Sequence, residues 1–195
     1  MERRTFSCGK KKAQNDNYEI VYVDESSISV ASQVSTTYAP IGETPVITVS
    51  TEINARQYAA SGISESGDLV YTVQKKPFNS KGITIFLEQL LRKIAGKILV
   101  IWDGASIHHS AETKKWLTTY KEASRLHLVR QPRYSPEFNA DEQVWNYLKN
   151  SVLKNTNIQN VKELKSRIVA GMEDLKKEPE RIKSFFRHPD LEFYN

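Results

Sequence analysis

Two aspartates stand at positions where the sequence pattern can bring them into one site. Asp24 ends the apolar run YEIVYV (18–23), and Asp103 ends the apolar run KILVIW (97–102). Ligands of open α/β sheets bind outside the carboxyl ends of the strands, so two parallel neighbours would project both carboxylates into one crevice. An unpaired buried charge is costly, so neither aspartate is expected in the core without a partner.

The stretch YSPEFNADEQVW (134–145) supplies a third acid. Its Asn139 is a favourable N-cap, and Glu142 follows three residues later, where the glutamate of a capping box stands. Glu142 also lies one helical turn before Trp145, at the border of the buried face of the predicted helix. The spacing alone therefore leaves two roles open for Glu142, helix capping and catalysis, and these roles do not exclude each other.

Three converging carboxylates favour hard cations, Mg²⁺ or Mn²⁺, as ligands of the site, because these ions prefer oxygen donors. Two such ions about 3.5–4 Å apart form the clamp that handles in-line phosphoryl displacement. The single cysteine, Cys8, excludes an internal disulfide framework and a cysteine-based zinc cage. The acids thus indicate oxygen-ligated metal chemistry, although three acids alone are weak evidence for it.

The first half of the chain is predicted to be mainly strands, followed by one helix. Apolar residues at helical spacing predict the helix over 80–95, with Ser80 as its candidate N-cap. A hairpin turn at SGD joins the last two strands. The predicted strands cover 18–23, a partner strand over 28–34, and 46–52, 55–64 and 68–75.

The second half alternates strands and helices. The continuous apolar run 97–102 is typical of a strand that is buried on both faces. Strands followed by a strand–helix–strand–helix series predict an α/β domain with a mixed sheet. The further elements are a helix over 110–121, a strand over 125–130, a helix over 140–153 and a more basic helix over 160–176.

Length and charge limit the class of protein. A chain of 195 residues is long enough for one sizeable domain with its own core. No apolar run approaches the roughly 20 residues of a membrane span, and the N-terminus lacks an apolar signal region, so a cytoplasmic protein is expected. Residues 1–12 and 149–187 are basic, whereas the stretch between them is slightly acidic. This pattern suits a polyanionic partner, with a solvated basic C-terminal helix as the alternative.

Three motifs, YVDES, VIWDGASIHHS and YSPEFNADEQVWNYLK, together resemble the catalytic domain of DDE transposases. The bacterial insertion-sequence branch of the mariner-like superfamily is the most similar branch, and the resemblance spans roughly residues 18–190. The chain departs from the family pattern at Ala140, where proline is usual, and at Gly104, where asparagine is frequent. The third family motif, S-P-acid-apolar-N-P-x-E-x-x-W, is matched by Ser135, Pro136, Glu137, Phe138, Asn139, Glu142 and Trp145.

The resemblance implies an RNase H-like fold, a mixed five-stranded sheet flanked by helices. It places Asp24 on the central first strand, Asp103 after the fourth strand and Glu142 on the late helix. It makes these three the catalytic residues and the ligands of two Mg²⁺ or Mn²⁺ ions that support DNA cleavage and strand transfer. Glu137 and Asp141 are then expected to be loop and first-turn charges.

Further residues are expected to contact the DNA backbone, with solvated surface as the alternative for each. His108 and His109 are predicted either to contact phosphate or to orient Asp103, with a surface loop pair as the alternative. Trp102 and Trp145 are expected in the core. The predicted DNA-contacting residues are His108, Arg130, Arg133, Lys149 and Lys154.

The domain organisation is predicted as a flexible segment 1–17 before a catalytic domain 18–190, whose basic C-terminal helices cover 149–187. The resemblance implies transposon ends and target DNA as partners, a homodimer in the active complex, and association with the bacterial nucleoid. It also implies a helix-turn-helix half that is missing from this chain. Two alternatives stay open, a non-catalytic DNA-binding or dimerisation relic and an RNase H-like nuclease.

Overall fold

The computed structural model describes residues 16–30, 38–43, 54–132, 135, 138–154, 156, 158–187 and 191. Five strands of the described residues form one mixed sheet in the order β3-β2-β1-β4-β5, which confirms the predicted α/β class and the five-stranded sheet that the resemblance implies. The predicted strand 46–52 and most of the segment 1–17 lie outside the described residues. The strands are β1 (Tyr18–Ser29), β2 (Arg56–Ser64), β3 (Leu69–Gln74), β4 (Lys97–Trp102) and β5 (Leu126–Arg130).

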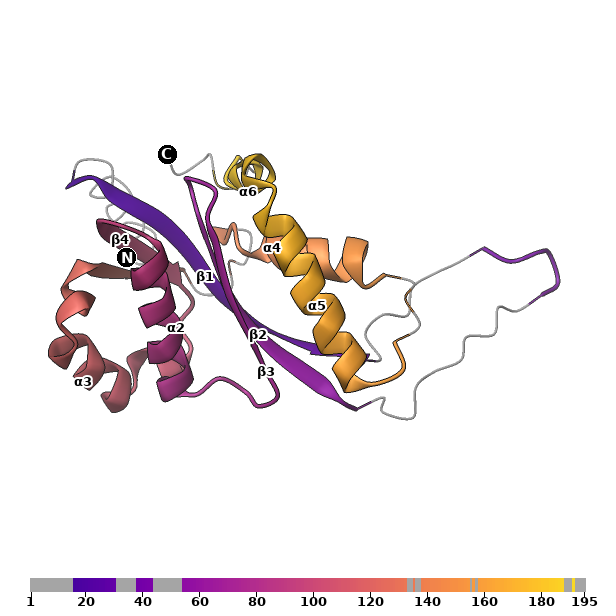
Figure 1. Cartoon of the computed structure of the whole chain (residues 1–195), viewed down its shortest axis with the longest axis horizontal. Coiled ribbons are helices and arrows are strands. Elements are labelled where there is room, and N and C mark those ends of the chain that lie inside the picture. Colours follow the sequence, from indigo (N-terminus) through magenta and orange to yellow (C-terminus); the bar gives the residue numbers. More distant parts are fainter. Residues whose placement is uncertain are drawn as a thin grey trace.

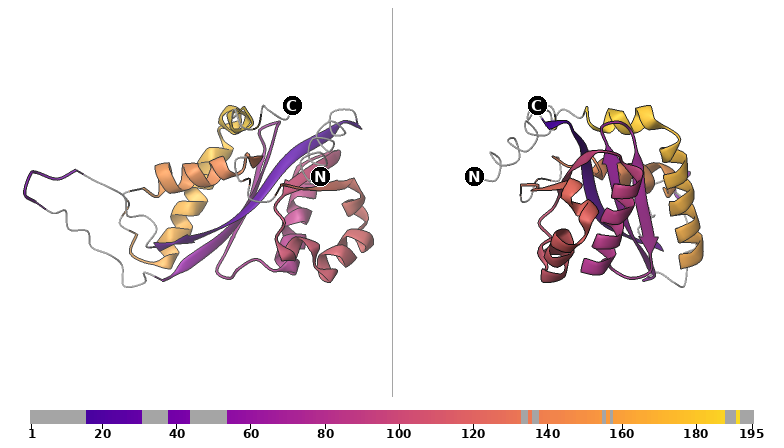
Figure 2. Two further views of the ribbon diagram at one scale, coloured as in Figure 1. Left: turned by 180° about the vertical axis from the view of Figure 1, so that it is seen from behind. Right: turned by 60° about the vertical axis from the view of Figure 1, so that its left-hand side comes forward.

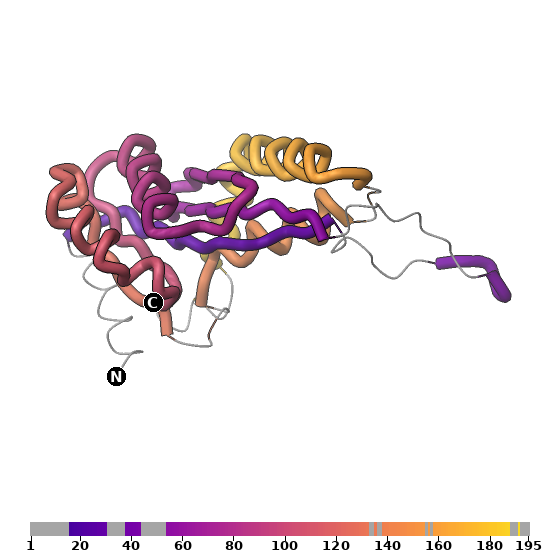
Figure 3. Tube along the Cα trace, turned by 90° about the horizontal axis from the view of Figure 1, so that it is seen from below, coloured from indigo at the N-terminus to yellow at the C-terminus, as the bar shows by residue number. Residues whose placement is uncertain are grey.

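Strand β1 occupies the centre of the sheet and is much longer than predicted (Figure 3). It runs parallel to β4 as far as the pair Tyr22↔Ile101, and antiparallel to β2 as far as Ser29↔Arg56. Asp24 therefore does not end its strand, as the sequence pattern predicted. It lies just beyond the end of the β4 pairing, while β2 continues to pair with the same strand. A separate strand was predicted over 28–34. This prediction is wrong at its start, because Ile28 and Ser29 continue β1.

Helices cover both faces of the sheet, as Figures 1 and 2 show. Successive residues of β1 point to opposite faces, as expected for a strand. Val21 and Val23 pack with α2 and α3, whereas Ile20 and Tyr22 pack with α4, α5 and α6. The helices are α2 (Ser80–Lys93), α3 (Ala111–Thr119), α4 (Glu142–Tyr147), α5 (Val161–Lys176) and α6 (Pro179–Phe185).

The predicted helices are present, with changes at their ends. Helix α2 is capped by Asn79 rather than Ser80, and the Asn79 Oδ1 atom accepts the Gly82 N–H at 2.9 Å. The helix predicted over 140–153 begins as α4 at Glu142 and continues as a π-helix, η5 (Leu148–Val152). Short 3₁₀ helices, η2 (Ser106–His109) and η3 (Lys121–Arg125), flank α3. Within the described part of the chain, no helix is long and apolar enough to cross a membrane.

Candidate active site

Asp24, Asp103 and Glu142 line the same cleft, which has a volume of about 530 Å³. Asp24 comes from the middle of β1, Asp103 follows β4, and Glu142 is the first residue of α4. The parallel pairing of β1 and β4 explains why the two aspartates meet, as the sequence predicted. The remaining lining residues are Gly104, Ala105, Arg130, Gln131, Pro132, Ser135 and Asn139.

Asp24 is held by the helix on the other side of the cleft. The indole Nε1–H of Trp145 donates a hydrogen bond to Asp24 Oδ2 at 2.9 Å. Burial of the carboxyl, together with the charges of Glu142 and Glu25, raises the pKa of Asp24 to about 7. Trp145 is buried, as predicted, but it also anchors this acid. The need of a buried indole N–H for an acceptor was the signal in the sequence that could have revealed this role.

Glu142 differs from a capping glutamate that stands at the same spacing elsewhere in the chain. At Asn160-x-x-Glu163, Asn160 Oδ1 accepts the Glu163 N–H at 2.9 Å, and Glu163 Oε2 accepts the Gln159 N–H at 2.9 Å. At Asn139-x-x-Glu142, Asn139 Oδ1 instead accepts the Asp141 N–H at 3.0 Å. Because the Glu142 side chain lines the cleft, its position favours the catalytic role that the spacing left open.

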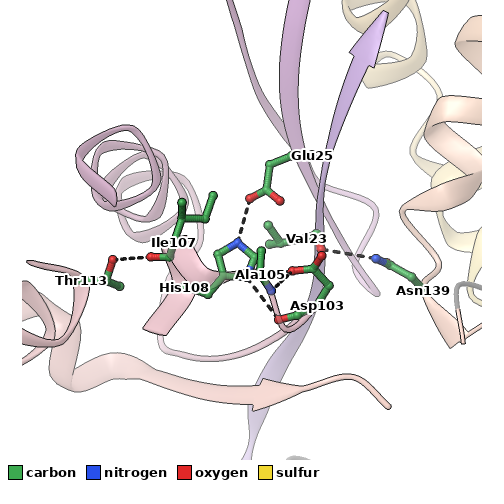
Figure 4. A network of polar contacts seen from close by, with 8 residues as sticks. All are labelled: Val23, Glu25, Asp103, Ala105, Ile107, His108, Thr113 and Asn139. Atoms are coloured by element: carbon green, nitrogen blue, oxygen red, sulfur yellow. Dashed lines mark hydrogen bonds and ion pairs between the residues drawn. The ribbon is translucent and has the colours of Figure 1, made fainter. Parts of the chain in front are cut away.

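Asn139 also connects this turn to the central strand. Its Nδ2 atom donates to the Val23 carbonyl at 3.4 Å, one residue before Asp24 (Figure 4). One hydrogen bond of the Asn139 side chain thus holds the turn at the start of α4, and the other joins this turn to β1. This connection fixes Glu142 relative to Asp24, so the asparagine of the third motif acts on the geometry of the site.

Asp141 is fully buried, so its predicted role as a first-turn charge is wrong. The hydroxyl of Ser61 donates to Asp141 Oδ2 at 2.5 Å. Burial raises the pKa of Asp141 well above its usual range. Ser61 is the β2 partner of Asp24, so a polar pair lies directly behind the cleft. Glu137, the other acid of this stretch, lies outside the described residues.

Asp103 is held by His108, whose side chain is only 1% exposed. The Nδ1 atom of His108 lies 3.0 Å from Asp103 Oδ1, and its Nε2 atom lies 3.0 Å from Glu25 Oε1 (Figure 4). The imidazole stacks on Trp102 with the ring centroids 4.1 Å apart. Both ring nitrogens are thus engaged, which favours the orienting role of His108 over a direct contact with DNA.

The side chains of Glu25, Asp103 and His108 interact electrostatically. Burial by itself would lower the pKa of His108, but the hydrogen bonds to Asp103 and Glu25 raise it to about 9. The hydrogen bond from His108 in turn lowers the pKa of Asp103. One ligand atom each from Glu25, Asp103 and His108 lies within 4.8 Å of the others, which is also a spacing that can hold a metal ion. At neutral pH the imidazolium supplies the positive charge of this cluster.

His108→Gln is expected to remove a pH dependence of stability in metal-free buffer. The pKa of His108 is higher in the folded chain than the value of about 6.5 in an unfolded chain. The stabilisation is therefore complete below pH 6.5 and is lost as the pH rises through about 9, by at most about 3 kcal/mol. Urea unfolding in EDTA across this window should show the loss in the wild type and in the exposed-neighbour control His109→Gln. An equally steep loss in His108→Gln would contradict the prediction.

The other predicted DNA-contacting residues are scattered. Arg130 lines the cleft. Lys149 lies in η5 and Lys154 follows it, and both are exposed outside the cleft lining. Arg133 lies outside the described residues. The structure thus places one cationic side chain of this group in the lining of the cleft and two outside it.

Comparisons with known proteins agree with this arrangement. A family model described as the DDE superfamily endonuclease matches residues 19–165. A 39 kDa protein of insertion element IS630 from Shigella sonnei is 27% identical over 161 residues, which are 80% of this chain and 45% of that protein. The chain therefore spans about half the length of this curated relative.

Solved structures of Mos1 mariner transposase share the fold. The Mos1 strand transfer complex matches with a TM-score of 0.59 and 16% identity over 94% of this chain and 60% of that chain. The isolated Mos1 catalytic domain matches with a TM-score of 0.55 and 14% identity over 94% of this chain and 91% of that chain. These matches confirm the predicted RNase H-like fold. With the family model covering most of its length, the chain belongs to the DDE superfamily of endonucleases.

Proposed function

We propose that this chain is the catalytic domain of a transposase that cleaves DNA phosphodiester bonds and transfers the freed strand. The observation that carries the proposal is the convergence of Asp24, Asp103 and Glu142, from three separate elements, on one cleft. Membership of the DDE endonuclease superfamily supports the same chemistry. We further propose these three acids as the catalytic residues.

The donor set of the cleft fits divalent cations. Asp24, Asp103 and Glu142 offer only carboxylate oxygens, which suit Mg²⁺ or Mn²⁺. Burial and the neighbouring acids disfavour the ionised form of Asp24, so a bound cation would relieve a cost that the metal-free site carries. Mos1 paired-end complexes have been solved with Mn and with Mg. Two bound ions would activate the attacking oxygen and stabilise the leaving oxygen.

The protein's own residues would hold the acids in place for two displacements. His108 fixes the Asp103 carboxylate, and Trp145 fixes that of Asp24. In the first displacement, a water oxygen attacks phosphorus and the bond to the 3′ oxygen breaks, which leaves a 3′-hydroxyl and a 5′-phosphate. In the second, the oxygen of the freed 3′-hydroxyl attacks a target phosphorus and the target bond to the 3′ oxygen breaks, which joins the strand to the target 5′-phosphate and releases a target 3′-hydroxyl. A plain nuclease would stop after the first step.

DNA is the proposed partner. The exposed Lys149 and Lys154 can contact phosphates, which would position DNA without reading its sequence. A solved Mos1 transposase paired-end complex contains the left transposon end, which supports transposon ends as substrate. We also propose that the active complex is a homodimer and that a separate helix-turn-helix half reads the terminal sequences. DNA binding by this chain alone should then be weak and salt-sensitive.

Calorimetric titration with Mn²⁺ and nicking of supercoiled plasmid DNA, each with the wild type and Asp103→Asn, test the proposal. We expect wild-type binding and nicking, and the loss of both in the variant, because one ligand carboxylate is removed. Asp68→Asn, in the turn between β2 and β3 and outside the cleft lining, serves as the control that should change neither. Equal Mn²⁺ binding by wild type and Asp103→Asn would contradict the assignment of the metal site. Joining of labelled oligonucleotide ends to the plasmid separates transposase from nuclease activity.

A further inference from the structure

Gly104, directly after Asp103, makes room for the side chain of Arg130. A Cβ atom at position 104 would lie 2.1 Å from Nη2, 2.4 Å from Nε and 2.5 Å from Cζ of Arg130. Real side chains essentially never approach so closely, so a larger residue would displace the guanidinium. Asparagine is frequent at this position in the family that the sequence resembles. The space that the Arg130 side chain occupies explains why this chain has glycine instead.

The sheet register brings these two residues together. Arg130 ends β5 and pairs with Trp102, the last residue of β4. The Gln131 N–H donates to the Trp102 carbonyl at 2.8 Å and continues the parallel pairing past the end of both strands. The side chain of Arg130 therefore starts from the rim of the cleft and covers the backbone that follows the catalytic aspartate.

One N–H donor of the Arg130 guanidinium has no acceptor. The Nε atom is buried, yet it has no hydrogen-bond partner among the described residues. Buried donors without a partner are rare, and such a group within a cleft indicates a ligand that is absent. Beside the hydrogen bond from His108, the charge of Arg130 lowers the pKa of Asp103, but this attraction through space leaves the Nε–H group without an acceptor.

The shape of the donor set indicates which ligand fits. The Nε–H and one terminal N–H of arginine form a planar edge that matches two oxygens of a phosphate or carboxylate. Three carboxylates already line the cleft, so it is poorly suited to a further carboxylate as ligand. A phosphodiester would lie with the acids and the cations they are proposed to bind on one side, and with the arginine on the other. The chemistry of the cleft therefore favours a phosphate group.

We propose that Arg130 binds the non-bridging oxygens of the scissile phosphodiester, and that Gly104 is the residue that admits it. This inference rests on the proposed cleavage of DNA in this cleft and adds a substrate-contacting residue to its three acids. Arg130 would stabilise the charge that develops on the phosphoryl oxygens, which is a different task from the backbone contacts of Lys149 and Lys154.

A double-mutant cycle of Gly104→Ala and Arg130→Gln tests the coupling. Arg130→Gln should lower the plasmid nicking rate about 10²-fold, because a donor to the transferring group is lost. Gly104→Ala should lower it by about tenfold or more, since the methyl group moves only the far end of a flexible side chain and leaves the fold intact. In the Arg130→Gln background, Gly104→Ala should have no further effect. Arg92→Gln, an exposed arginine on α2, is the matched control.

A second measurement keeps the test independent of the proposed function. The Arg130 Nε–H resonance, assigned by its absence in Arg130→Gln, should shift when a short DNA duplex is added, and this shift should vanish in Gly104→Ala. Nicking by Arg130→Gln at nearly the wild-type rate would overturn the inference. If the wild type does not nick, a shifted Nε–H resonance supports the arginine contact while the proposed cleavage by this chain fails. An Nε–H resonance that DNA does not move overturns the inference in either case.

Discussion

Asp24→Asn is expected to abolish metal-dependent DNA cleavage and, in metal-free buffer, to make the protein more stable. Loss of cleavage follows from loss of a ligand carboxylate at the cleft. The gain in stability follows from the raised pKa of Asp24, about 7, which burial and the charges of Glu142 and Glu25 produce. Asparagine has the same shape, carries no charge and can still accept the hydrogen bond of the Trp145 indole.

The sign of the effect depends on pH. A carboxyl whose folded pKa is higher than its unfolded pKa binds more protons in the folded state, so the stability of the wild type falls as the pH rises from about 4 to about 7. The shift of about three pKa units corresponds to at most about 4 kcal/mol. Water in the open cleft screens the charges, so about 2 kcal/mol is the expected gain above pH 7.

Urea unfolding in EDTA at pH 4 and pH 8, beside plasmid nicking in Mg²⁺, measures both effects. The wild type and Asp24→Asn should have similar stability at pH 4, whereas the variant should be more stable at pH 8. Asp68→Asn, in the turn between β2 and β3, should nick DNA as the wild type does and lose at most about 1 kcal/mol at either pH, because its carboxylate only forms a surface ion pair with Lys93. A variant that is less stable at pH 8, or one that still nicks DNA, would contradict the assignment of Asp24 as a metal-poised acid.

The opposed effects on stability and activity distinguish a functional acid from a structural one. A structural carboxylate is satisfied by its partners, so its removal weakens the fold. Asp24 accepts hydrogen bonds from the Trp145 indole and the Glu25 backbone N–H, but burial and two acidic neighbours outweigh them and leave its charge poorly compensated in the metal-free protein. Strain of this kind is typical of active sites, where groups are arranged for a ligand rather than for the fold.

The sequence predicted those parts of the site that depend on local pattern. The apolar run before Asp103 specifies a buried strand, and its parallel pairing with β1 follows from the α/β order of elements. The position of Asp24 within its strand was not predictable, because it depends on how far β2 continues to pair after β4 has ended. The register between distant segments decides where the pairing of two strands ends, and the hydrophobic periodicity within one segment does not predict that register.

Contacts between distant residues account for the other differences. Asp141 is a residue type that is common at helix starts, and its buried carboxyl is hydrogen-bonded only by the hydroxyl of Ser61, 80 residues earlier, among the described residues. The contact of Arg130 with Gly104 likewise follows from the pairing of β5 with β4. In each case the role of a polar residue depends on a partner that only the folded chain brings near it. The pattern within one segment of the sequence cannot predict such a partner.

The two Asn-x-x-Glu stretches of the chain allow the dual interpretation of Glu142 to be tested by a matched pair, Glu142→Gln and Glu163→Gln. Glu142→Gln should lower plasmid nicking at least about 10³-fold, because a ligand carboxylate is lost, with little change in stability. Glu163→Gln should leave nicking unchanged and lower the stability slightly, because the Glu163 carboxylate accepts the Gln159 N–H and pairs with Arg167 at the surface.

Nicking rates in Mg²⁺ and urea unfolding in EDTA, measured on both variants, separate the two roles. If Glu142 were only a cap, its substitution would resemble that of Glu163, with a small loss of stability and full activity. Helix α4 begins at Glu142, where Asn139 already supplies an acceptor to the first turn, so the fold has little need of a glutamate there. A loss of activity without a loss of stability would therefore assign the carboxylate to the cleft rather than to the helix.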